Sequence, residues 1–392
     1  MPITKEGLSK KDELRLHPDR FEAIDNKLKQ WVKEGLYPAI NAIVIRDGTE
    51  IFRGSYGKTC PDSDSRELTL DTIYPMASIT KPIVATLMMI LSEDGELELN
   101  DPVCKYLPEF NSDDKKDIAI WHLLTHTSGI EDEVIYKNAH EYCKDNFETE
   151  LTDDNWDEVM AIAKEKLDLP NVDNREVWKY IQRLQKPSRK PREAMMYSSF
   201  GFDIAKDIIC KVSGKSIDQF ASERLFNPLG MTDTHWILPK EKWERVIRRP
   251  EGFEGYPWQN QDESFVNESG GGGLKSTAND MMKFCEMIRG EGRYEDARIM
   301  SPITVRGMVK NHNIEGFPAF EAWGLGFNYH GIKCDDMGLV RPETAIDHGG
   351  YGGSRIFIDF ENRLSWVLFT VKPLEMDNIF ARFAAMIYAG LD

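Results

Sequence analysis

The chain has 392 residues, of which 41% are hydrophobic, and a formal net charge of −17 at pH 7. This length exceeds the size at which a single hydrophobic core usually stops growing, so we expect at least two subdomains. The acidic balance argues against a nucleic-acid partner, which would need a basic face. No uncharged apolar run approaches the roughly 18 residues of a membrane span, which argues against a membrane protein.

The N-terminal segment is charged from the start and lacks the apolar centre of a signal peptide. Six cysteines are spread along the chain without a C-x-x-C pair: Cys60, Cys104, Cys143, Cys210, Cys285 and Cys334. In a chain with no export signal we expect reduced thiols, and neither a disulfide framework nor a zinc site. These features predict a cytoplasmic globular protein and say nothing of its oligomeric state.

The predicted elements begin with a helix and a β-hairpin. Apolar residues recur at helical spacing over 19–34, at Phe21, Ile24, Leu28 and Trp31. Residues 39–57 form two strand-like runs joined by Asp47-Gly48, a dipeptide typical of hairpin turns. At the far end, 354–371 predicts a second hairpin that turns near Glu361-Asn362. The C-terminal helix that we expect after it has one apolar face, made by Ile379, Phe383, Met386 and Ile387.

Strand patterns at both ends, with mostly helical patterns between them, predict an α/β fold of the α+β type. We expect the terminal strands to share one antiparallel sheet flanked by helices, with a mostly helical domain inserted. The first domain would comprise 1–75 and 270–392, and the insert 76–269. Within the insert, 131–190 is rich in charges but spaces its aromatic and aliphatic residues for amphipathic helices. We therefore expect this segment to be a folded cap over a cleft.

A serine followed three places later by a lysine occurs at Ser55, Ser78 and Ser112. Only Ser78 precedes a helix pattern, which ends at Gly95. With Ser78 at the N-cap, Lys81 would lie one turn further along the same helix face. Serine caps helices readily, but the helix dipole disfavours a cation in the first turn. The alternative is a nucleophile with its base, because burial and the dipole favour a neutral amine.

Two further stretches carry chemical groups. Tyr197, in MMYSSFGFDIAKDII, precedes another helix start, where a phenol near a neutral amine can relay a proton to a leaving group. A half-buried core tyrosine is the alternative. His348, in AIDHGGYGGSRIFIDF, stands with four glycines before a strand. Such glycines let a substrate lie against the strand and leave a backbone N–H to face an oxyanion, unless they form a plain turn.

His122 and His126 are spaced like zinc ligands on a helix. The glutamate of an H-E-x-x-H motif is missing and no third ligand is evident, so we interpret both as packed, hydrogen-bonded histidines and expect no metal or cofactor. The stretch SGGGGLKSTANDMMKF lacks the spacing of a phosphate loop. Thr277 and Asp280 predict a capping box for the helix that follows.

Taken together, these motifs resemble the penicillin-recognising serine hydrolases. That superfamily includes class C β-lactamases, D-alanyl-D-alanine carboxypeptidases, family VIII carboxylesterases and related amide hydrolases and acyltransferases. The resemblance runs from about residue 20 to the C-terminus. SITK, YSS and HGG are similar to the three family motifs, and LLTHTSGI, NPLGMTDT, GGGLKSTANDMMKF and WGLGF resemble other landmarks in the expected order. It implies a β-lactamase/transpeptidase-like fold.

The resemblance also implies roles for single residues. Ser78 would be the nucleophile, Lys81 its base, and Tyr197 a partner in proton transfer. The backbone N–H groups of Ser78 and Tyr351 would form the oxyanion hole. Further residues would line the substrate cleft, namely Ser199, His348, Gly349 and Gly350. The reaction would pass through an acyl-serine that water or another acceptor then attacks.

Two departures from the family pattern bear on substrate choice. Ser199 stands where β-lactamases and peptidases usually carry asparagine, whose amide can bind a substrate amide on both sides. His348 replaces the lysine of penicillin binders and weakens the fixed charge for a substrate carboxylate. Both changes favour neutral esters or small amides.

We therefore predict a serine hydrolase that acts on small acyl esters. Within the enzyme class, the alternatives are a D-amino-acid peptidase or amidase, a weak β-lactamase and an acyltransferase. A catalytically silent binding protein is disfavoured because serine, lysine and tyrosine are all present, and a metal-dependent hydrolase is a weaker rival.

Overall fold

The computed structural model describes residues 14–60, 65–313, 321–329, 340–374 and 379–391. Its centre is a six-stranded antiparallel sheet in the order β2-β1-β10-β9-β8-β7. The strands are β1 (Ala39–Arg46), β2 (Thr49–Gly57), β7 (Asn328–Tyr329), β8 (Ile346–Gly350), β9 (Ser354–Asp359) and β10 (Leu364–Thr370). Because β1 pairs with β10, the two ends of the chain share one sheet, as the sequence predicts.

Both predicted hairpins are present. The first turns at Asp47 and Gly48, which adopt φ angles of 50° and 72°, the left-handed values that tight hairpin turns need. The second joins β9 to β10 across residues 360–363. Every residue of β10 is buried, because helices cover both faces of the sheet and its apolar run is therefore continuous.

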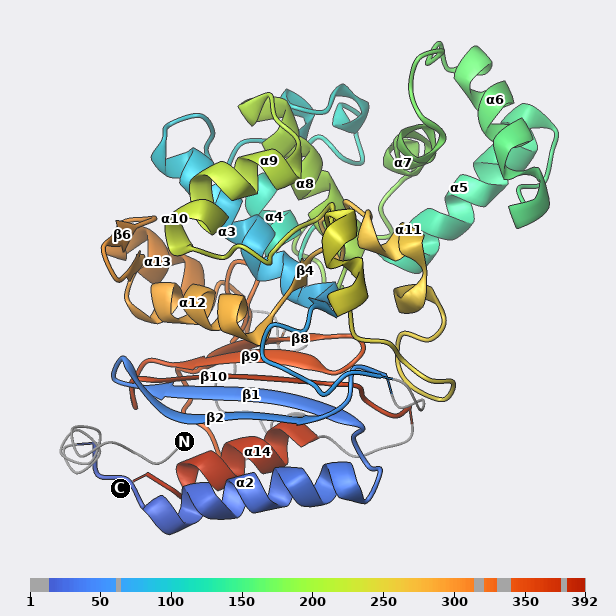
Figure 1. The fold of residues 1–392 in the computed structure, drawn as a ribbon. Coiled ribbons are helices and arrows are strands. Elements are labelled where there is room, and N and C mark those ends of the chain that lie inside the picture. The colour runs from blue at the N-terminus through green and yellow to red at the C-terminus, as the bar shows by residue number, and fades with distance from the viewer. Residues whose placement is uncertain (1–13, 61–64, 314–320, 330–339, 375–378, 392) are drawn as a thin grey trace.

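Helices form a layer on each face of the sheet (Figure 1). The helices α2 (Pro18–Lys33) and α14 (Ile379–Tyr388) pack on one face, with a core that includes Trp31, Trp366 and Phe383. On the other face lies the larger core, around the three longer helices α3 (Thr80–Glu93), α8 (Ser199–Ser213) and α12 (Ala278–Arg289). This layered α+β arrangement matches the predicted fold class, while the domain boundaries at 75/76 and 269/270 stay a prediction.

Shorter elements complete the helical side. The helical ones are η1 (Ala77–Ile79), η2 (Val103–Lys105), η3 (Pro108–Phe110), α4 (Ile120–Leu124), η4 (Asp153–Asn155), α9 (Ile217–Ala221), the π-helical η5 (Ser222–Phe226), α10 (Asn227–Leu229), η6 (Lys240–Arg245), η7 (Trp258–Asn260), α11 (Asp262–Phe265) and α13 (Pro302–Val309). Two small sheets pair β3 (Tyr74–Pro75) with β4 (Lys275–Ser276), and β5 (Arg293–Tyr294) with β6 (Ala297–Arg298).

The predicted cap is folded and has its own core. Its helices are α5 (Asp132–Phe147), α6 (Trp156–Lys166) and α7 (Asn174–Leu184), which extend away from the body in Figure 1. Buried apolar side chains between them include Phe147 and Val159, with Trp156 and Trp178 packed against that core.

The structure bears on the expectations of reduced cysteines and of no membrane span, within the described residues. Cys104, Cys143, Cys210 and Cys285 are free thiols, whereas Cys334 lies outside the described residues. Among the helices of the described segments, none combines the length and apolar character needed to cross a bilayer.

Candidate active site

Ser78 lies in a tight 3-10 turn, η1, that leads from β3 directly into α3. The predicted N-cap role is wrong: α3 begins at Thr80, its N-cap is Ile79, and no side chain caps it. Ser78 lies inside the preceding turn, and the Thr80 hydroxyl bonds the Ala77 carbonyl. Ala77 has a φ of 44°, a strained value for a residue with a side chain, directly before the serine.

Lys81 is the buried centre of the site. Its side chain is fully enclosed, and Nζ lies 2.9 Å from Ser78 Oγ, 3.2 Å from Ser199 Oγ and 2.7 Å from the Gly271 carbonyl oxygen. An amine with three such neighbours is fixed in position and directed at the serine hydroxyl. The pairing of Ser78 with Lys81, expected from their spacing, is therefore present although the capping geometry differs.

Burial lowers the pKa of Lys81 from 10.5 to about 7, because a charged amine is costly away from water. The carboxylates of Asp203 and Asp132 act in the opposite direction and favour the charged form. With a pKa near neutrality, a substantial fraction of Lys81 is uncharged and able to accept a proton at pH 7.

Tyr197 lies two residues before α8, with its hydroxyl close enough to Ser78 for the serine to affect its pKa. The residue as a whole is 47% exposed, yet desolvation raises the pKa of the phenol, and the neighbouring Ser78 hydroxyl offsets part of this rise. Lys81 Nζ lies 4.7 Å from the centre of the Tyr197 ring. A phenol whose pKa is raised keeps its proton at neutral pH and is a proton donor, while Lys81 is the better acceptor.

Ser199 opens α8 and is held by Asp132, the first residue of the cap helix α5. The Asp132 carboxylate accepts hydrogen bonds from Ser198 Oγ (2.5 Å) and from the backbone N–H groups of Ser199 (2.7 Å) and Phe200 (3.2 Å). A carboxylate at a helix N-terminus satisfies unpaired N–H groups and complements the helix dipole. Asp132 thus ties the cap to the segment that carries Tyr197 and Ser199.

His348 lies in β8, buried opposite Tyr197, with a ring-centre distance of 6.3 Å. Its Nδ1 lies 2.9 Å from the Gly349 carbonyl, which can only accept, so Nδ1 carries the proton. Burial foremost, and then the charge of Lys81, lower its pKa to about 3, so the imidazole is neutral at pH 7. The third motif therefore carries no positive charge for a substrate carboxylate.

Gly350, at the end of β8, packs directly on the turn that bears Ser78. A Cβ placed on Gly350 would lie 2.2 Å from the Met76 carbonyl oxygen, so only glycine allows this approach. The approach places the end of β8 directly against Met76 and Ile79, on either side of Ser78 in the chain. Gln259 Nε2 donates to the Tyr351 carbonyl at 3.0 Å, and Glu254 Oε2 accepts from the Gly352 N–H at 3.0 Å. These bonds fix the backbone of the loop after β8.

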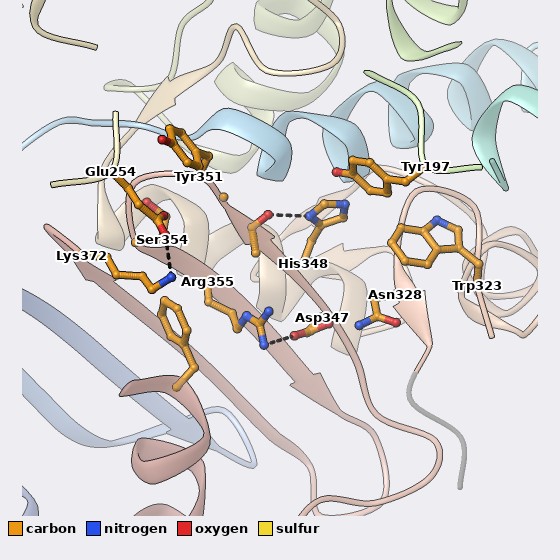
Figure 2. Close-up of a pocket in the computed structure, with 14 residues that line it drawn as sticks. Tyr197, Glu254, Trp323, Asn328, Asp347, His348, Tyr351, Ser354, Arg355 and Lys372 are labelled. Atoms are coloured by element: carbon orange, nitrogen blue, oxygen red, sulfur yellow. Dashed lines mark hydrogen bonds and ion pairs between the residues drawn. The ribbon is translucent and has the colours of Figure 1, made fainter. Parts of the chain in front are cut away.

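A cavity of about 570 Å³ opens beside this loop. Figure 2 shows Tyr197, Trp323 and His348 gathered at one end and Tyr351, Glu254 and Lys372 at the other. A second hollow of about 430 Å³ lies between the cap and α8. Its lining includes Asp132, Tyr136 and Gln182 from the cap and Ser199 and Phe200 from α8. Tyr197 lines the first hollow, and Ser199, which accepts a hydrogen bond from Lys81, lines the second.

His122 and His126 are packed, hydrogen-bonded side chains. His122 Nδ1 accepts the Ala119 N–H at 2.9 Å, and His126 Nδ1 accepts the Ser198 N–H at 3.1 Å. Within the described segments, no group of three or more His, Cys, Asp or Glu side chains is arranged to hold a metal ion. The predicted capping box is half present: Thr277 caps α12 through the Asp280 N–H, but the Asp280 carboxylate bonds the Asp233 N–H.

The sequence interpretation missed three supporting residues, Asp132, Asp203 and Gly271. Asp203 Oδ1 accepts from the Gly270 N–H at 2.7 Å and from Ser269 Oγ at 2.8 Å, which holds the glycine-rich turn that presents the Gly271 carbonyl to Lys81. A cluster of glycines beside the family motif was visible in the sequence. The two aspartates lie far from Ser78 along the chain, and no local pattern distinguishes them from surface carboxylates.

A serine hydroxyl bonded to a buried lysine, with a tyrosine beside the pair, is the arrangement of a serine hydrolase. A sequence model of the family described as Beta-lactamase matches residues 24–389. The chain therefore belongs to the β-lactamase family, a family of serine hydrolases that share the Ser-x-x-Lys pair, here Ser78 and Lys81.

Relatives in this family carry different activities. D-alanyl-D-alanine-carboxypeptidase/endopeptidase AmpH of Escherichia coli (strain K12) is 27% identical over 346 residues, covering 85% of this chain and 80% of its own. Esterase EstB of Burkholderia gladioli is 25% identical over 381 residues, covering 90% of each chain. Among solved structures, EstCE1, described as a hydrolase with promiscuous acyltransferase activity, superposes with a TM-score of 0.69 at 18% identity, covering 95% of this chain and 97% of its own. This last likeness shows the shared fold.

Proposed function

We propose that this hydrolase cleaves small acyl esters through a covalent acyl-serine intermediate. Neutral Lys81 takes the Ser78 proton while Ser78 Oγ attacks the ester carbonyl carbon, and the backbone N–H groups of Ser78 and Tyr351 stabilise the oxyanion. Tyr197 gives a proton to the departing alkoxide as the acyl C–O bond breaks, and the alcohol leaves. The Lys81 ammonium then returns the Ser78 proton to the Tyr197 phenolate. Water attacks the acyl carbon and gives a proton to Lys81, the bond between the acyl carbon and Ser78 Oγ breaks, and Lys81 passes that proton to Ser78 Oγ as the acid leaves.

The observation that carries this proposal is the 2.9 Å contact between Lys81 Nζ and Ser78 Oγ, made by an amine whose pKa is lowered to about 7. A lysine that stayed charged could donate to the serine oxygen but could not remove its proton. The raised pKa of Tyr197 keeps the phenol protonated at pH 7, as a proton donor must be.

The choice of esters over amides rests on Ser199 and His348. Ser199 offers a short hydroxyl that already accepts from Lys81, in place of a longer side-chain amide. Neutral His348 supplies no cation for a substrate carboxylate. EstB, an esterase, is among the relatives, which agrees with this choice.

A peptidase or amidase acting on D-amino-acid substrates is the second candidate, favoured by the similarity to AmpH. An acyltransferase or a weak β-lactamase would use the same acyl-serine and differ only in the acceptor or the acyl donor. Comparison of a small ester, the corresponding amide, a D-Ala-D-Ala peptide and a β-lactam on the same preparation separates these activities.

The first test is hydrolysis of p-nitrophenyl butyrate by the wild type and by Ser78→Ala, with circular dichroism to check that both are folded. We expect turnover by the wild type and none above background by the variant. Equal activity of the two proteins would place the chemistry elsewhere. Inactivity of both on this ester would favour the amide substrates or a silent binding protein.

The substrate is a small molecule, and the cap sets the shape of the acyl pocket through its contribution to the hollow lined by Tyr136 and Gln182. Acyl-enzyme formation predicts a mass increase on Ser78 after rapid quenching. A cytoplasmic location is part of the proposal and is testable by cell fractionation.

A further inference from the structure

His126, which the proposed reaction does not use, holds the chain on both sides of Tyr197. Its carbonyl oxygen accepts the Met196 N–H at 2.7 Å, and its Nδ1 accepts the Ser198 N–H at 3.1 Å. The His126 ring lies against the Tyr197 ring, with centres 4.4 Å apart and planes at 34°. Backbone, side-chain nitrogen and ring face of one residue therefore all engage the segment 196–198.

The conformation of His126 is itself unusual. Its φ of 59° lies in the left-handed region, which only a few per cent of residues other than glycine adopt, although histidine does so more often than most. Such a conformation persists where surrounding contacts hold it, and strained residues cluster at functional sites. Here the holding contacts include the two hydrogen bonds to the chain around Tyr197.

The ring also has a defined protonation state. Because Nδ1 accepts a backbone N–H, the proton of the neutral imidazole lies on Nε2. Burial keeps the pKa of His126 well below 6.5, and the nearby Lys81 and His348 act in the same direction. Phe202 and Trp323 enclose the remaining sides, with ring centres 5.3 and 4.9 Å away. His126 therefore acts as a fixed neutral acceptor.

We propose that His126 is the positioning residue of Tyr197, which keeps the phenol hydroxyl on Ser78 and so sets the efficiency of proton donation to the leaving group. This inference rests on the proposed function, in which Tyr197 donates that proton. His126 does not touch Ser78 or the reacting atoms in this scheme, so its effect is indirect.

His122 offers a matched control in the same motif. It too is a buried histidine whose Nδ1 accepts a backbone N–H, that of Ala119 at 2.9 Å. Its ring packs against Trp121 instead, with ring centres 4.1 Å apart. A substitution of His122 therefore reports the general cost of removing a packed histidine from this region.

The test compares two esters that differ in their need for a proton donor. The p-nitrophenolate group leaves readily without a proton, whereas the ethoxide of ethyl butyrate requires one. General acid catalysis typically contributes about 10²–10⁴-fold, so Tyr197→Phe should lose about 100-fold or more on ethyl butyrate and far less on p-nitrophenyl butyrate.

His126→Gly tolerates the positive φ and removes both the acceptor and the ring. We expect it to reproduce the selective loss on the ethyl ester by at least about tenfold in kcat, with KM changed little. His126→Asn keeps an acceptor at the Nδ1 position and the same backbone conformation, and should restore most of that loss. His122→Asn should affect both esters equally. If the glycine variant does not fold, His126→Leu fills the space without an acceptor and replaces it.

Equal losses on both esters for the His126 and His122 variants would reduce His126 to a packing residue and overturn the inference. Crystal structures of the His126 variants give a readout that does not depend on turnover: the Tyr197 hydroxyl should move away from Ser78 Oγ in the glycine variant and stay in the asparagine variant. A wild type that is inactive on both esters would contradict the proposed ester hydrolysis. The position of Tyr197 in the crystal structures would still decide whether His126 positions it.

Discussion

Replacement of Lys81 by methionine should abolish activity and, at the same time, stabilise the folded protein in acid. Methionine has nearly the same length and no charge, so it fills the buried space without an amine. Acylation should fall by about 10³-fold or more, because Ser78 loses its base. The stability gain follows from the cost of enclosing an amine whose pKa is lowered from 10.5 to about 7.

The pH dependence of this gain can be worked out from the pKa shift. The folded-state pKa of Lys81 is depressed, so the unfolded chain binds the proton more tightly, and the penalty is full below pH 7. It shrinks as pH rises from 7 towards 10.5, because the unfolded chain alone remains protonated there. A shift of about 3.5 units at 1.36 kcal/mol per unit gives a total near 5 kcal/mol. Between pH 6 and pH 9 the penalty should fall by about 2.5 kcal/mol.

The assay is urea unfolding of the wild type and Lys81→Met at pH 6, 7, 8 and 9, followed by fluorescence. The difference in unfolding free energy between the two proteins cancels the titration of all groups that they share. Lost hydrogen bonds of Lys81 shift this difference by a constant, so the slope against pH is the informative quantity. If the difference in unfolding free energy does not change from pH 6 to pH 9, the pKa of Lys81 is not lowered in the folded protein. That result would contradict the role of Lys81 as the base.

Two further substitutions test the substrate contacts and the oxyanion hole. Ser199→Asn should raise amidase activity relative to esterase activity by about tenfold, because the longer side chain offers both a donor and an acceptor to an amide. The ratio is measured with matched butyryl esters and amides. An unchanged ratio would contradict the role given to position 199. Gly350→Ala should lower kcat by about 10²-fold while the protein stays folded. The added Cβ would lie 2.2 Å from the Met76 carbonyl oxygen and displace the loop that bears the Tyr351 N–H. A near-normal kcat would contradict the role of this backbone in oxyanion binding.

The sheet and its hairpins could be predicted because local rules suffice there. Asp47-Gly48 fixes a two-residue turn, and the apolar runs on either side fix the register between β1 and β2. The pairing of β1 with β10 joins segments more than 300 residues apart, and only the resemblance of the terminal patterns suggested it. The start of α3 was misjudged, because the strained Ala77 and the 3-10 turn arise from tertiary contacts with β8 that no local propensity encodes.

The residues within the sequence motifs could be predicted as parts of the candidate site. The residues that support them from elsewhere in the chain could not. Ser78, Lys81 and Tyr197 come together as expected. Asp132 was hidden because a carboxylate in the first turn of a charged helix has no distinguishing pattern, although three hydrogen bonds join it to the start of α8. His126 was visible, but its spacing from His122 drew attention to metal binding instead of the contact with Tyr197.

The electrostatic balance at Lys81 shows why these hidden residues belong to the site. Burial alone would drive the amine pKa lower still, and the carboxylates of Asp203 and Asp132 offset part of that effect without touching Ser78. A base works best when its pKa lies near the working pH, so the two carboxylates contribute to the base alongside burial, which is the larger effect. Asp132 also begins the first cap helix and caps α8, so a movement of the cap would shift both the charge near Lys81 and the backbone of Ser199. The cap is thereby joined to the chemistry of the site through one carboxylate, in addition to any contact that it makes with substrate.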